Sequence, residues 1–93
     1  MFIICYDFRD DRIRNKFSSY LKKYGRKIQY SIFEIKNSRR LLKNILNEIE
    51  LKYRKEFQNS DSIIIFQVCD RCQKEIVRYG YAKNEDSDVI IFE

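Results

Sequence analysis

The residue best suited to chemistry in this chain is Asp7, which follows the apolar segment 2–6. The chain contains no histidine, which excludes Ser-His and Cys-His nucleophile pairs and paired-histidine ribonuclease chemistry. A hard cation such as Mg²⁺ takes oxygen ligands, keeps several waters and can be held by one or two carboxylates. Two interpretations of Asp7 are therefore open: it binds Mg²⁺ or another divalent cation, or it caps the turn that ends a strand.

The chain carries a positive charge that is concentrated in its first half. Its 93 residues have a net charge of +5 and a pI of about 9.2. Residues 1–43 contain 12 Lys or Arg and 4 Asp or Glu, giving +8, whereas residues 44–93 contain 7 and 10, giving −3. Such a field attracts polyanions, which favours nucleic acid as a partner over a merely solvated basic surface. The cations expected to contact its backbone are Arg12, Arg14, Lys16, Lys27, Arg39 and Arg40.

Apolar periodicity predicts the elements that position these residues. Strands are expected over residues 2–6, 28–35, 62–68, 76–79 and 89–92, and one helical turn over residues 70–74. Asp10 is a suitable N-cap for a first helix, and Gly25 is expected to end it as a C′ glycine. Ser38 is expected to cap a second helix. The helical stripes are Ile13, Phe17, Tyr20, Leu21 and Tyr24, then Leu41, Leu42, Ile45, Leu46, Ile49 and Tyr53.

This order predicts an α+β fold of the ferredoxin-like βαββαβ type, in which two helices cover one face of an antiparallel sheet. Residues 26–35 form either one bent strand or two. We expect residues 1–80 to form the ferredoxin-like domain. Residues 81–93 would form a hinge and an extra C-terminal strand.

A homodimer is predicted because two helices leave one face of the sheet uncovered. The segment 2–6 is apolar throughout, and alternation places Phe33 on this second face. Pairing of two sheets would bury the surface, and the C-terminal strand could join the partner's sheet edge. Two Asp7 carboxylates near the two-fold axis would repel each other unless a cation lay between them. One shared divalent cation would resolve this repulsion.

The remaining candidate groups favour packing over chemistry. Cys69 and Cys72 form a single pair, whereas zinc needs four ligands, so packing thiols or an incidental pair are favoured over an intersubunit zinc site. Tyr30 is expected in the core with the other periodic tyrosines, whereas Tyr6 lies next to Asp7 and is a candidate site residue. No secretory signal is evident, and the longest apolar run is about five residues, against roughly 20 for a membrane span. We therefore expect a cytoplasmic protein without a membrane partner.

Several motifs together resemble the CRISPR-associated protein 2 family. They occur in the family's order and spacing, most specifically over residues 2–35, and the resemblance covers nearly the whole chain. They are Tyr6-Asp7, Asp10-Asp11, Arg14-Asn15-Lys16, Leu21-Lys22-Lys23-Tyr24-Gly25, Ile28-Gln29-Tyr30-Ser31-Ile32-Phe33-Glu34 and Cys69-x-x-Cys72.

The resemblance implies a ferredoxin-like homodimer whose C-terminal strand joins the partner's sheet. It also implies that Asp7 binds a divalent metal at the dimer interface. By the same resemblance, positions tied to nuclease activity in some members are occupied by Tyr6, Arg14, Lys16, Lys27 and Phe33. Lys16 and Lys27 stand where arginine can occur, and lysine lacks the bidentate fork of arginine.

Two functions follow from the resemblance. In one, the dimer binds duplex DNA and bridges the catalytic subunits of the CRISPR spacer-acquisition integrase. In the other, it is a Mg²⁺-dependent endonuclease that acts on single-stranded RNA or duplex DNA, with Asp7 and Tyr6 at its catalytic centre. Alternatives are a stand-alone toxin-like endoribonuclease and a structural dimer that binds no nucleic acid.

Overall fold

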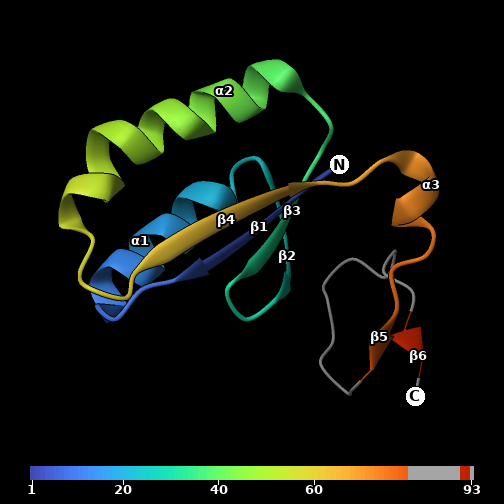
Figure 1. The fold of residues 1–93 in the computed structure, drawn as a ribbon, viewed down its shortest axis with the longest axis horizontal. Coiled ribbons are helices and arrows are strands. Elements are labelled where there is room, and N and C mark those ends of the chain that lie inside the picture. Colours follow the sequence, from blue (N-terminus) through green and yellow to red (C-terminus); the bar gives the residue numbers. More distant parts are fainter. Residues whose placement is uncertain (80–90, 93) are drawn as a thin grey trace.

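The computed structural model describes residues 1–79 and 91–92 of the chain, and a four-stranded antiparallel sheet organises residues 1–67 (Figure 1). Its strand order is β2-β3-β1-β4, so β1 lies in the interior of the sheet, as its apolar sequence predicts. Every neighbouring pair is antiparallel. The strands are β1 (Phe2–Asp7), β2 (Gly25–Gln29), β3 (Ile32–Ile35) and β4 (Ser62–Gln67).

Two helices connect these strands. The helix α1 (Asp11–Leu21) joins β1 to β2, and α2 (Arg39–Glu48) lies between β3 and β4. The helix α2 continues into a π-helical turn (Ile49–Tyr53) and a 3₁₀ turn (Arg54–Glu56). The element order and the strand order confirm the predicted α+β ferredoxin-like fold.

Both predicted N-caps are confirmed. The Asp10 carboxylate accepts a hydrogen bond from the Arg12 amide at 2.8 Å, and the Ser38 hydroxyl accepts one from the Leu41 amide at 3.2 Å. Each bond satisfies an amide that the first turn of a helix leaves without a partner. The two helices therefore begin where their sequences predict.

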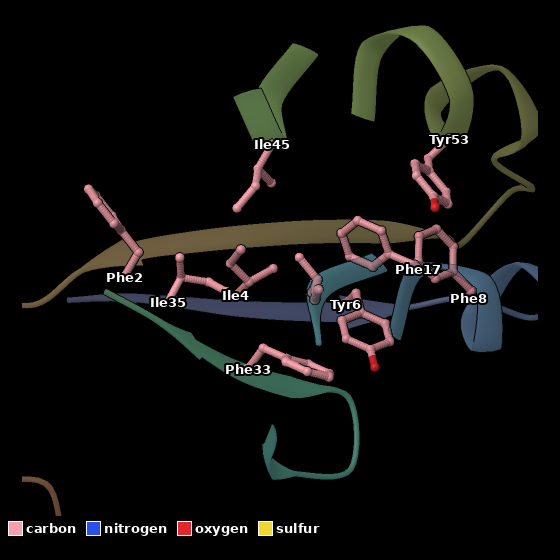
Figure 2. Close-up of a cluster of buried hydrophobic side chains, with 10 residues drawn as sticks. Phe2, Ile4, Tyr6, Phe8, Phe17, Phe33, Ile35, Ile45 and Tyr53 are labelled. Atoms are coloured by element: carbon pink, nitrogen blue, oxygen red, sulfur yellow. The ribbon is translucent and has the colours of Figure 1, made fainter. Parts of the chain in front are cut away.

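The core lies between the helices and one face of the sheet (Figure 2). Alternate residues of β1 point to opposite faces, so every second side chain of this strand is buried. The same cluster contains residues of both helices, which therefore cover the same face of the sheet. Its buried members are Phe2, Ile4, Tyr6, Phe8, Phe17, Leu21, Phe33, Ile35, Ile45 and Tyr53.

Residues 26–35 form two strands, because a tight turn at Tyr30 and Ser31 separates β2 from β3. Ser31 has a φ of 64°, the left-handed conformation that such turns need. The turn, with a register shift between Lys27 and Gln29, breaks the alternation assumed for one continuous strand. The expectation that Phe33 lies on the second face is therefore wrong: its ring is fully buried in the core.

Gly25 does not end α1, contrary to the sequence prediction. The helix ends at Leu21 with Lys22 as its C-cap, and Gly25 is the first residue of β2, opposite Ile35. A Cβ atom at Gly25 would lie 2.1 Å from the Glu34 carbonyl oxygen and 2.5 Å from the Cδ1 atom of Ile35. The position needs glycine because the facing strand approaches so closely.

The face of the sheet opposite the helices carries apolar side chains. On β4, Ile64 and Phe66 are each 51% exposed, whereas Ile63 and Ile65 pack against the core. In register, Ile64 lies beside Cys5 of β1, and Phe66 lies beside Ile3. We call this side of the sheet the open face. No helix among the described residues is long and apolar enough to span a membrane.

After β4, the described residues form three short elements. They are α3 (Asp70–Gln73), β5 (Arg78–Tyr79) and β6 (Ile91–Phe92), and β5 pairs with β6 in parallel. The predicted hinge, and residues 89 and 90 of the predicted last strand, lie outside the described residues. The division of the chain at residue 80 and the pairing of its last strand with a partner stay predictions.

Candidate metal and nucleic-acid site at the end of strand β1

Asp7 is the last residue of β1 and its side chain is exposed. It lies opposite Ser62 of β4, two residues along the strand from the Cys5–Ile64 pair. Because side chains alternate along a strand, Asp7 shares the open face with Ile3 and Cys5. The sheet therefore presents this carboxylate at the margin of its apolar surface, where a second copy of the chain could reach it.

The Asp7 carboxylate is available as a ligand. Within residues 1–79 and 91–92 it has no hydrogen-bond or ion-pair partner, whereas Asp10 caps α1 and Asp11 pairs with Arg14. No group of three or more potential metal ligands occurs in that part of the chain. A single subunit thus offers one oxygen donor group for a hard cation, which is half of the symmetric site predicted from the sequence.

Arg14 is held in place beside Asp7. Its Nη2 atom donates a hydrogen bond to the carbonyl oxygen of Phe8 at 2.6 Å, and its Nη1 atom forms an ion pair with Asp11. The hydrogen bond that Arg14 donates to the Asp11 carboxylate raises the pKa of Arg14 above its ordinary value. Since Phe8 directly follows Asp7, the guanidinium is anchored next to the candidate ligand.

Tyr30 brings a second cation to the same end of the sheet. The Lys27 Nζ atom lies 5.3 Å from the centroid of the Tyr30 ring, and the Arg14 Cζ atom lies 5.8 Å from it. The Tyr6 amide donates to the Ser31 carbonyl at 3.1 Å, which ties the Tyr30–Ser31 turn to β1. Arg14 and Lys27 therefore gather around the Tyr30–Ser31 turn, which is bonded to β1 at Tyr6, the residue before Asp7.

Sequence analysis missed Tyr30 as a site residue. We expected it in the core, but its side chain is 65% exposed because it occupies the turn between β2 and β3. An exposed aromatic ring flanked by cations is a surface that can stack on a base while the cations contact phosphates. A turn at Tyr30-Ser31, which divides residues 26–35 into two strands, is the sequence feature that could have identified it.

Tyr6 lies on the other side of the sheet from Asp7. Its side chain is 5% exposed and contacts the rings of Phe8, Phe17 and Phe33 (Figure 2). Burial raises the pKa of the Tyr6 phenol, and a hydrogen bond with Ser18 lowers it by a smaller amount. The structure thus gives Tyr6 a packing role, and its catalytic role stays a prediction.

The other predicted cations are divided between separate places. Lys16 lies with its Nζ atom 5.8 Å from the Tyr53 ring centroid, and Arg12 is exposed in the first turn of α1. Arg39 is at the opposite end of the sheet, with its Cζ atom 5.9 Å from the Phe2 ring. β1 spans five residue steps from Phe2 to Asp7, or about 17 Å. Of the predicted cations, Arg14 and Lys27 lie beside Tyr30, and Arg12 lies in the first turn of α1, which follows the Asp7 end of β1.

Arg40 also lies at the Phe2 end of the sheet, in the first turn of α2. The β3 strand that leads to this helix ends at Ile35, which is opposite Phe2 in register. The sheet therefore carries cations at both ends, separated by about the length of one strand.

Cys69 and Cys72 are both exposed, so they are not packing thiols. The Cys72 amide donates a hydrogen bond to the Cys69 sulfur at 3.3 Å. This bond lowers the pKa of Cys69, whereas the hydrogen bond between the two side chains raises the pKa of Cys72. Cys5 is half-buried in β1, and burial raises the pKa of its thiol.

Comparison with known proteins places this chain among CRISPR proteins. Residues 1–76 match the family described as CRISPR associated protein Cas2. A relative from Methanospirillum hungatei, named CRISPR-associated endoribonuclease Cas2 2, is 33% identical over 96% of both chains. A relative from Synechocystis, CRISPR-associated endoribonuclease Cas2 3, is 36% identical over 71% of this chain and 67% of its own.

A solved structure shares the fold. It is the crystal structure of a hypothetical protein, TT1823, from Thermus thermophilus, which is 29% identical to this chain. The match has a TM-score of 0.64 and covers 73% of this chain and 79% of the other.

Proposed function

Because this chain belongs to the CRISPR-associated protein Cas2 family, we propose that it is a CRISPR nuclease that works as a homodimer on nucleic acid. In this proposal, two Asp7 carboxylates, one from each copy, hold a divalent cation such as Mg²⁺. The observation that carries the proposal is the position of Asp7, an exposed carboxylate without a described partner at the margin of the open face. The names of the two relatives, which call them endoribonucleases, support cleavage of RNA.

The open face supports the homodimer. Ile64 and Phe66 are each half exposed there, and contiguous exposed apolar surface marks interaction sites in soluble proteins. Pairing of two open faces would bury these side chains together with Ile3. With β1 close to the two-fold axis, the same pairing would bring both Asp7 carboxylates together. A cation between them would offset the repulsion of two like charges.

The residues around Asp7 have the chemistry that phosphodiester hydrolysis needs. When bound, Mg²⁺ supplies an activated water and neutralises charge on the scissile phosphate. Arg14, which Phe8 and Asp11 hold in place, directs its remaining N–H groups to a phosphate oxygen. Lys27 adds a second positive charge, and Tyr30 offers an exposed ring for a neighbouring base. Water attacks the phosphorus atom and gives up a proton to solvent, the bond from phosphorus to the leaving ribose oxygen breaks, and that oxygen takes up a proton from solvent.

The test is cleavage of a labelled single-stranded RNA by the wild type and by the Asp7→Asn variant, with Mg²⁺ and with a chelator. We expect Asp7→Asn and the chelator each to abolish cleavage, because the described residues offer no other cluster of metal ligands. Asp70→Asn is the matched control, since it removes one exposed carboxylate from α3 and should leave cleavage unchanged. Undiminished cleavage by Asp7→Asn would place the catalytic metal elsewhere.

The homodimer is tested separately by sedimentation. We expect a mass of two chains for the wild type at micromolar concentration. Replacing the exposed Phe66 by Asp should give single chains, because an unpaired charge in an apolar interface is costly. A wild type that sediments as a single chain would contradict the dimer.

A second candidate function is supported by the cations at both ends of the sheet. In this proposal the dimer binds duplex DNA and bridges catalytic subunits of the spacer-acquisition integrase. The two ends lie about 17 Å apart along the strand, which is the length of about five base pairs at a rise of about 3.4 Å per base pair. Spacer acquisition in cells that carry Asp7→Asn distinguishes the two functions: it persists if the chain is a bridge and fails if its cleavage is required.

A further inference from the structure

A surface depression of about 410 Å³ lies beside the first turns of α2 and the turn that follows α1. Lys23 contributes from the turn after α1, Lys36 from the segment after β3, and Arg40 from α2. Ser38 and Asn44 add a hydroxyl and an amide to the lining. We call this depression the cationic groove, because three of its lining residues are positively charged and none is acidic.

Within residues 1–79 and 91–92, no acidic side chain neutralises the charge of the cationic groove. Neither Lys23, Lys36 nor Arg40 forms an ion pair or hydrogen bond with its side chain in the part of the chain that the structure describes. Three cations around one hollow repel each other, and a concave surface of one sign focuses the field on a counter-ion. The arrangement therefore favours an anion with several oxygen atoms.

A neighbouring depression has a different charge pattern. It has a similar volume of about 420 Å³ and shares Lys36 with the cationic groove. Its lining, however, includes Glu34 and Asp70, and Glu34 forms an ion pair with Arg26. Acidic groups in this second hollow offset the cations, so an anion gains less there.

The backbone fixes the residues of the cationic groove. The Lys23 amide donates to the Tyr20 carbonyl at 3.2 Å, which closes the turn after α1. The Ser38 amide donates to the Lys36 carbonyl at 2.8 Å, and the Ser38 side chain caps α2. The backbone of these residues therefore loses little further freedom when a ligand binds.

We propose that the cationic groove is a second phosphate-binding site, which holds a phosphate of a nucleic-acid backbone. It lies at the Phe2 end of the sheet, because Lys36 directly follows Ile35, the partner of Phe2 in register. Along the strand direction it is therefore about one strand length, or about 17 Å, from Asp7. That span is about five base steps of a duplex. The proposal extends the proposed function and rests on nucleic-acid binding by this chain.

The test compares two triple variants in their affinity for a short duplex across a range of salt concentrations. The first variant is Lys23→Gln with Lys36→Gln and Arg40→Gln. The control, Lys52→Gln with Arg54→Gln and Lys55→Gln, removes the same charge at exposed positions away from the cationic groove. Loss of this one phosphate contact should reduce the slope of log affinity against log salt by about 0.9, so the loss of affinity between about 50 and 200 mM salt becomes about 3.5-fold smaller. The control should change this slope by much less.

Equal slopes for the two triple variants would overturn the proposal, because the effect would then follow net charge alone. A second arm measures the thermal stability of the wild type with inorganic phosphate. If phosphate stabilises the wild type but the groove variant keeps the full salt slope, the site takes a free anion and the proposal also fails. If the wild type binds no nucleic acid, the proposed function fails first. Lys23→Arg with Lys36→Arg keeps the charge and should restore the slope, which excludes misfolding as the cause.

Discussion

Replacing Gly25 by Ala tests the close approach of β2 and β3 that positions Lys27 and Tyr30. The new Cβ atom would lie 2.1 Å from the Glu34 carbonyl oxygen and 3.0 Å from its carbonyl carbon. These are backbone atoms, so no change of side-chain rotamer removes the overlap. Part of the β2–β3 pairing must move instead, and the hairpin that carries the Tyr30 turn moves with it.

Two opposing effects determine how much free energy of unfolding the Gly25→Ala variant loses. Overpacking costs about 1–3 kcal/mol, and a backbone overlap this close belongs at the upper end of that range. The lower chain entropy of alanine in the unfolded state returns about 0.4–1 kcal/mol. The net loss in the free energy of unfolding is therefore about 2 kcal/mol. For a chain of this length it corresponds to a fall of about 8–16 °C in Tm.

The assay is thermal and urea unfolding followed by circular dichroism. Ser31→Gly is the matched control in the same hairpin, because it relaxes a residue with φ at 64° and should cost no stability. Gly25→Ala should also weaken nucleic-acid binding at temperatures where the variant is still folded. A free energy of unfolding within about 0.5 kcal/mol of the wild type would refute the close approach, since surface substitutions alone fall in that range.

Three further outcomes are expected. Desolvation raises the pKa of Tyr20 to about 12, whereas the pKa of the unfolded side chain is about 10. The contribution of Tyr20 to stability is therefore fully present below pH 10 and is lost as the pH rises toward 12. Urea unfolding of Tyr20→Phe should show a smaller loss of stability between pH 10 and 12 than the wild type, and an equal loss would contradict the raised pKa. Tyr30→Ala should weaken binding of single-stranded RNA by about 1–3 kcal/mol at unchanged stability, if the ring stacks on one base. Tyr79→Ala, at another exposed tyrosine, is its control, and equal effects of the two would argue against stacking. Cys69 should react with iodoacetamide at lower pH than Cys72, because the hydrogen bond from the Cys72 amide lowers the pKa of Cys69. Mass spectrometry of the alkylated peptide measures the order, and earlier alkylation of Cys72 would contradict this hydrogen bond.

The sequence predicted those elements whose apolar pattern is uninterrupted. The strand ending at Asp7, the two helices and the strand after residue 61 follow from periodicity of two or 3.6 residues. Asp10 and Ser38 were identified as caps because their side chains bond to nearby amides, which is a local interaction. Such features need no information about distant parts of the chain.

The hairpin was not predictable in the same way. The segment from Ile28 to Ile35 alternates like one strand, and only the turn at Ser31 reverses the faces of the residues that follow. One misplaced step in a pattern of period two exchanges the two faces of a strand. For this reason Phe33 was assigned to the wrong face, and Tyr30 was placed in the core.

The ferredoxin-like fold, the family and the candidacy of Asp7 could be predicted from the sequence, because they depend on residue types and their order along the chain. Which residues meet was evident only from the tertiary structure. It separated Tyr6 from Asp7 by the plane of the sheet, gathered Arg14 and Lys27 around Tyr30, and joined Lys23, Lys36 and Arg40 in one groove. The physical reason is that charges act through distances in space, and strand pairing sets those distances between residues far apart in the chain.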